Sequence, residues 1–169
     1  MTSPEPPSSR VRLAIAQYDR PGHPSPPGHE HWALVVAIPG APSQAGGWQV
    51  FQIVGNTDTY CYQTKAFCET ERALLCGGCA VGELLQGAEG VEWLKDHLES
   101  AVEIVRGDPA WNCQRWVVEV VRELRQHPDR VAVLPSFNER KARAVLFKER
   151  EDWECGEDHY FERLEREWK

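Results

Sequence analysis

Hydrophobic residues follow two different periods along the chain, and the change between them divides it into two halves. Up to about residue 85, apolar runs and alternation predict strands over 11–18, 31–38, 48–54, 60–67 and 74–85. Beyond that point, apolar residues recur at helical spacing and predict amphipathic helices over 91–105, from about 108 to 127, and over 137–151. Strands followed by helices predict an α+β fold, with helices packed on one side of an antiparallel sheet.

A single domain is the expectation for 169 residues. Residues 1–10 are rich in proline and serine and are expected to be disordered. The domain is assigned to 11–151. The remaining segment, 152–169, is heavily charged, with apolar residues at helical spacing: Tyr160, Phe161, Leu164 and Trp168. It is expected either to dock as a helix or to remain a loose tail.

Charge and composition narrow the classes of partner. The formal net charge of −7 argues against binding nucleic acid through its phosphates, and against an anionic membrane surface. No run approaches the roughly 20 apolar residues of a transmembrane helix, so stable membrane insertion is not expected. The start of the chain lacks the apolar core of a secretory signal, which favours a cytoplasmic protein whose six cysteines are thiols or metal ligands. The oligomeric state stays open.

The helix near residue 113 has a cysteine close to its start. Asp108 is expected to cap this helix and Pro109 to occupy its first position. Cys113 shares an apolar stripe with Trp116, Val117, Val120, Val121 and Leu124, so its sulfur should face the protein body. A helix N-terminus favours a thiolate. The cysteine is therefore either a nucleophile or a buried core residue.

A nucleophilic thiol needs a base, and His31 is the candidate. It begins an apolar strand, whose end could lie beneath the N-terminus of the Cys113 helix. Equally, a histidine at the end of a strand is commonly structural.

The motifs H-W-A-L-V-V at 31–36 and N-C-Q-R-W-V at 112–117 resemble those of the circularly permuted papain-like superfamily. That superfamily includes PPPDE-type isopeptidases and the lecithin:retinol acyltransferase group, with NlpC-type peptidases as relatives. The chain is most similar to a group of fungal proteins with an H-W-x-L strand and an N-C-Q-x-W helix. The resemblance covers about residues 11–127.

The resemblance implies a permuted papain-like fold in which Cys113 is the nucleophile and His31 the general base. Gln52 stands where similar sequences carry histidine, and it would orient the imidazole without stabilising its cation as a carboxylate would. His29 competes with His31 for the role of base. Trp111 and Asn112, beside the cysteine, are the candidate substrate contacts. The implied function is a thiol-dependent hydrolase or acyltransferase acting on an amide, isopeptide or (thio)ester in a peptide, protein or acyl substrate, with no cofactor.

Two other classes remain open. A non-catalytic binding module could keep the same fold, and Gln52 in place of histidine favours that reading. A small metal-binding or redox protein could be built on four cysteines, Cys61, Cys68, Cys76 and Cys79, of which the last two form a C-x-x-C pair.

Overall fold

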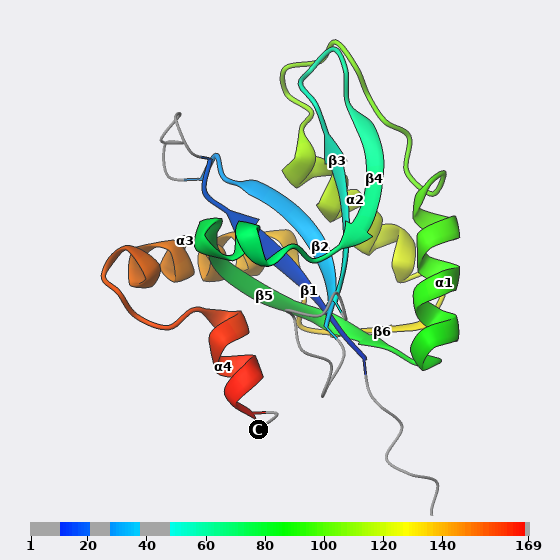
Figure 1. Ribbon diagram of the computed structural model, residues 1–169. Helices are drawn as coiled ribbons and strands as arrows, with labels where there is room; N and C mark the ends of the chain where they lie inside the picture. The colour runs from blue at the N-terminus through cyan, green and yellow to red at the C-terminus, as the bar shows by residue number, and fades with distance from the viewer. Residues whose placement is uncertain (1–10, 21–27, 38–47, 168–169) are drawn as a thin grey trace, which may run out of the picture.

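A six-stranded antiparallel sheet forms the centre of the protein (Figure 1). The structure is a computed structural model that describes residues 11–20, 28–37 and 48–167. The strands are β1 (Val11–Tyr18), β2 (His31–Ala37), β3 (Gln49–Val54), β4 (Cys61–Ala66), β5 (Leu75–Leu84) and β6 (Val131–Val133). Their order in the sheet is β4-β3-β2-β1-β5-β6. The five strands expected from the sequence are therefore confirmed to within one or two residues.

The central strands are buried on both faces, which explains why their sequences are almost continuously apolar. In β1, Leu13 and Ile15 contribute to one hydrophobic core, whereas Ala14 and Ala16 contribute to a second core on the opposite face. β1 pairs with β2 in a register that places Tyr18 opposite His31. This register brings both residues to the same end of the sheet.

Three helices, α1 (Gly87–Leu98), α2 (Cys113–Leu124) and α3 (Glu139–Glu154), contribute to the larger core. The apolar stripe of α2 is completely buried, with Trp116, Val117 and Val121 among its members. Because α2 packs on β2 and β3, its N-terminus lies at the end of the sheet where β2 begins.

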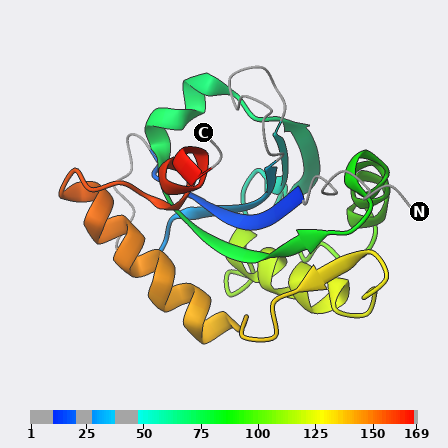
Figure 2. The same ribbon diagram turned by 90° about the horizontal axis from the view of Figure 1, so that it is seen from below.

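A fourth helix, α4 (Tyr160–Glu167), covers the other face together with the 3-10 helix η2 (Glu69–Leu74), as Figure 2 shows. Phe161 and Leu164 of α4 are buried against that face. The close approach needs a glycine in β5, because a Cβ at Gly78 would lie 2.5 Å from the Phe161 ring. The fold is α+β as expected, but helices cover both sides of the sheet rather than one. Of the two expectations for 152–169, docking as a helix is confirmed for Tyr160–Glu167.

Three expected helix boundaries were wrong. The helix expected over 91–105 is α1 and ends at Leu98; Val102, Ile104 and Val105 pack on the core outside any helix, because an apolar residue can be buried in either conformation. Asp108 does not cap α2 but accepts a hydrogen bond from the Ala110 N–H in the preceding turn. The helix expected over 137–151 is α3, which is capped by Asn138 and runs from Glu139 to Glu154.

The single domain over 11–151 stays a prediction. In the structure, α4 adds Phe161 and Leu164 to the second core from beyond that range. The expected disorder of residues 1–10, together with Trp168, lies outside the described residues. None of the helices in the described ranges has the length and apolar character required to cross a bilayer.

Candidate active site

Cys113 is the first residue of α2, closer to the helix N-terminus than the sequence had suggested. Asn112 is the N-cap, and its side-chain Oδ1 accepts from the backbone N–H groups of Gln114 and Arg115 at 3.0 and 3.1 Å. Among the described residues, no acceptor bonds to the Cys113 N–H. The sulfur therefore lies where the partial positive charge of the helix is greatest, with a free backbone donor beside it.

His31 is held by a chain of hydrogen bonds that runs across three strands. Its Nε2 lies 2.7 Å from Oε1 of Gln52 on β3. The Gln52 amide nitrogen in turn donates to Oε1 of Gln63 at 2.8 Å, and Gln63 is the direct partner of Gln52 in the β3–β4 ladder. Since the amide nitrogen faces Gln63, the amide oxygen faces His31 and accepts from Nε2–H. Nδ1 of His31 is then left as an unprotonated acceptor.

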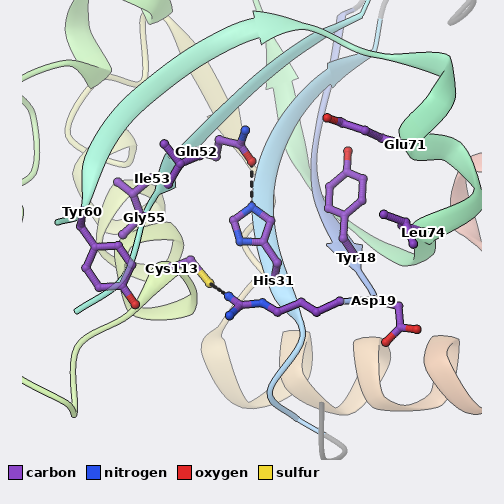
Figure 3. A pocket seen from close by; sticks show the side chains of 12 residues that line it. Tyr18, Asp19, His31, Gln52, Ile53, Gly55, Tyr60, Glu71, Leu74 and Cys113 are labelled. Atoms are coloured by element: carbon purple, nitrogen blue, oxygen red, sulfur yellow. Dashed lines mark hydrogen bonds between the residues drawn. The ribbon is translucent and has the colours of Figure 1, made fainter. Parts of the chain in front are cut away.

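The Cys113 thiol and the His31 ring open into one cavity of about 310 Å³ at the end of the sheet. Figure 3 shows the His31 ring between Gln52 and Cys113, with its second nitrogen turned toward the sulfur. The cavity walls come from six segments and include Tyr18, Arg20, His31, Gln52, Tyr60 and Cys113. Cys113 is only 3% exposed, so its reagents must enter through this cavity.

The environment lowers the pKa of the Cys113 thiol below its usual value. Burial acts in the opposite direction and is the largest single influence, but hydrogen bonding and charge from His31, a hydrogen bond from the Trp32 backbone and the charge of Arg20 together outweigh it. The Arg20 guanidinium lies 3.8 Å from Sγ. The site therefore favours a thiolate in a largely buried position, where an unassisted cysteine would be protonated.

Gln114 joins the two halves of the site. Its side-chain amide is buried and donates to the backbone carbonyls of Gly28 and Glu30, both at 2.9 Å. The residue after Cys113 is thereby bonded to the residue before His31. The Glu30 carboxylate is also buried and pairs with Arg150 of α3 at 3.1 Å, which fixes the same segment from the other side.

The structure thus brings Cys113, His31 and Gln52 together, as the resemblance implied. It does not place His29 with them: His29 is exposed and does not line the cavity.

The two expected substrate contacts are corrected. Trp111 is buried in the larger core, where its ring packs edge-on against Tyr60 with centroids 5.8 Å apart. Asn112 uses its side chain to cap α2. Neither residue lines the cavity.

The four cysteines between 61 and 79 do not come together as a metal site. Cys76 and Cys79 are buried in β5, whereas Cys61 is exposed on β4, at the far edge of the sheet. Burial raises the pKa of the Cys76 thiol to about 12 and that of Cys79 to about 11, so both are protonated core thiols. The zinc set proposed from their spacing is therefore wrong.

Sequence reasoning missed four residues of the site: Arg20, Tyr18, Gln63 and Gln114. Arg20 follows β1 in a segment with no periodicity, and only the fold reveals its proximity to the sulfur. Gln63 could have been found only with the β3–β4 register, which no local signal specifies. Gln114 lies inside the N-C-Q motif, so its position was visible but its bonds were not.

Comparison with known proteins places the chain in a family. The model of a family of unknown function, DUF6914, matches residues 10–155, a range that contains every residue of the site described above. No curated protein and no solved structure matches the chain.

Proposed function

The chain belongs to DUF6914, a family of unknown function, and we propose that it is a thiol-dependent hydrolase or acyltransferase that acts through Cys113 and His31. The observation that carries the proposal is the Cys113–His31–Gln52 arrangement at the base of the cavity. A core cysteine would need neither a helix N-terminus, nor an oriented imidazole, nor an opening to solvent.

The proton route follows from the tautomer that Gln52 selects. With Nε2–H held by Gln52, the lone pair on Nδ1 of His31 can accept the proton of the Cys113 thiol. Gln52 is neutral, so it orients the ring but adds no charge to stabilise the imidazolium. The nearby thiolate supplies that stabilisation itself.

The reaction proceeds in two balanced halves. The Cys113 thiolate attacks the substrate carbonyl carbon, and the carbonyl oxygen takes up the negative charge, for which the Cys113 N–H is the available donor. The tetrahedral intermediate collapses, the bond to the leaving group breaks, and His31 gives its proton to that group. The product is a thioester on Cys113. Water or another nucleophile then gives a proton to His31 and attacks the thioester, which releases the acyl group and regenerates the thiol.

The cavity offers further polar groups to a substrate. Tyr18 lines it, and among the described residues the buried Tyr18 hydroxyl has no hydrogen-bond partner. Burial raises the pKa of this hydroxyl, so it is a neutral donor. Arg20 contributes a positive charge beside the sulfur. Both groups suit a substrate with hydrogen-bond acceptors next to the scissile carbonyl.

The proposal extends to a circularly permuted papain-like fold. The order of the catalytic residues supports it, since the histidine lies on a strand early in the chain and the cysteine begins a helix far downstream. The packing of that helix on the strand that carries the histidine supports it as well.

Trapping of the acyl-enzyme tests the proposal. With p-nitrophenyl acetate, the wild-type protein should release a burst of p-nitrophenolate stoichiometric with enzyme, and peptide mass spectrometry should find the acetyl group on Cys113. Cys113→Ala should abolish the burst, and His31→Ala should slow it by roughly 10²- to 10⁴-fold, the usual contribution of a general base.

Cys155 is the internal control, because it is free and exposed and lies outside the cavity. Acetylation of Cys155 at the same rate as Cys113, or a burst that survives in Cys113→Ala, would contradict the proposal.

A further inference from the structure

A second cluster of reactive side chains lies at the opposite end of α2 from Cys113. His97 is in the last turn of α1, Glu123 is in the last turn of α2, and His127 follows three residues after that helix ends. Ten residues of helix separate Glu123 from Cys113, which is roughly 15 Å along the axis. The cluster is therefore separate from the cavity, and nothing in the proposed reaction uses it.

The three side chains converge on one point. Nε2 of His97 lies 2.6 Å from one oxygen of Glu123, and Nε2 of His127 lies 2.8 Å from the other. One potential ligand atom from each residue lies within 4.8 Å of the other two. In the part of the chain that the structure describes, no other three histidine, cysteine or acidic residues come together in this way.

We propose that His97, Glu123 and His127 form a binding site for a divalent metal ion of the zinc class. Two imidazoles and one carboxylate are a donor set that zinc uses, and a water molecule would complete the tetrahedron. Ligand atoms about 2.1 Å from a tetrahedral zinc lie about 3.4 Å apart. On binding, the nitrogen–oxygen contacts of 2.6 and 2.8 Å would widen, and the other separations between ligand atoms, which are all within 4.8 Å, would narrow.

The surroundings favour a cation at this point. The cluster lies at the C-terminal ends of α1 and α2, and the C-terminal end of a helix carries the partial negative charge that attracts a cation. The three side chains are only 22–33% exposed, so they have lost much of their mobility before a metal arrives.

Aromatic contacts hold the two imidazoles in place. Trp93 stacks on His97 with ring centroids 4.4 Å apart and meets His127 edge-on at 5.3 Å. Because one indole contacts both imidazoles, their rings are arranged before any ion binds. A bound ion would join the end of α1 to the end of α2, the helix that carries Cys113.

Cobalt(II) is the direct probe, since it occupies zinc sites and reports its ligands by absorption. Added to the full-length protein, it should bind with one-to-one stoichiometry and give d–d bands without a thiolate-to-cobalt charge-transfer band. Zinc should displace it and should raise the melting temperature. His97→Gln and His127→Gln should each weaken cobalt binding at least tenfold. Loss of a group that only hydrogen-bonds to a metal ligand typically costs about 10- to 100-fold in affinity, and loss of a ligand should cost at least as much.

His29→Gln is the matched control, because His29 is an exposed histidine outside the cluster. Glu123→Gln provides a variant that keeps hydrogen-bonding groups in place, and circular dichroism without metal establishes that each variant is folded. The proposal is overturned if the wild type binds no cobalt, if a charge-transfer band shows that cysteines are the ligands, or if the folded histidine variants bind as well as His29→Gln.

Discussion

At the residue scale, the site depends on one neutral side chain that sets the tautomer of another. Gln52 is buried, and its amide is oriented by Gln63, so Nδ1 of His31 faces the thiol as an acceptor. The sequence placed a polar residue here but could not show whether it faced the site, because a shift of one residue in register would reverse the strand faces.

Replacement of Gln52 should therefore change reactivity more than stability. We expect Gln52→Ala to slow acylation of Cys113 by roughly 10- to 100-fold, less than the loss of the base itself. Gln52→Glu should shift the alkylation profile of Cys113 to lower pH, because a carboxylate stabilises the imidazolium that accompanies the thiolate. Both effects are measured by peptide mass spectrometry across a pH series.

Gln49→Ala is the control for the loss of a glutamine from this strand. Gln49 also lies on β3, but its side chain donates to the Thr64 hydroxyl at 2.7 Å and does not line the cavity. A purely structural role for Gln52 would make the two alanine variants equal in reactivity.

At the element scale, the site is the junction between the start of α2 and the ends of two strands. The central strands β1, β2 and β3 were predictable because burial on both faces makes them short, almost continuously apolar runs, whereas β4 is half-buried or exposed and has a weaker pattern. The start of α2 was less predictable, since Asp108-Pro109 and Asn112 are both acceptable starts and only packing selects the second. The contacts of Arg20 and Gln114 with the site could not be predicted, because they join segments far apart in the chain.

The N-cap of α2 gives a test at this scale. Asn112→Ala should lower the free energy of unfolding by about 1 kcal/mol, the usual cost of losing a cap. It should also slow Cys113 alkylation, because the capped first turn positions the thiol. Urea denaturation and alkylation rates measure the two effects.

Asn138→Ala is the matched cap variant, since Asn138 caps α3 through a single bond to the Lys141 N–H. It should cost similar stability and leave Cys113 unchanged. If Cys113 were alkylated at the same rate in the two variants, the cap of α2 would have no role in positioning the thiol, and the prediction would be wrong.

At the scale of the whole molecule, the sheet is covered on both faces, and α4 closes the face opposite α2. This helix lies beyond the range matched by the family model. His159 precedes it and is nearly completely buried, with its Nδ1 accepting from the Phe161 N–H. The start of α4 is therefore held by a histidine that must stay neutral.

The stability of the protein should depend on pH through His159. Burial, aided by Arg72 and Arg163, lowers the pKa of His159 to about 4, against about 6.5 in an unfolded chain. Between pH 6.5 and about 4, His159 is protonated in the unfolded chain but stays neutral in the folded protein. The free energy of unfolding therefore decreases as the pH falls from about 6.5 toward 4. Melting temperatures across this range should fall more steeply in the wild type than in His159→Asn. The asparagine has a shorter side chain that does not titrate but can still accept a hydrogen bond from the Phe161 N–H. Parallel curves would show that other groups control the acid transition.

The account rests on an activated Cys113, and its pH-dependent alkylation is the most direct measurement. Iodoacetamide labelling of all six cysteines, followed by peptide mass spectrometry across a pH series, gives an apparent pKa for each reactive thiol. We expect Cys113 to show a value well below the ordinary one of about 8.5 and to lose this shift in His31→Ala, while Cys155 is unchanged. A Cys113 profile that coincides with that of Cys155, or that does not respond to His31→Ala, would contradict the account.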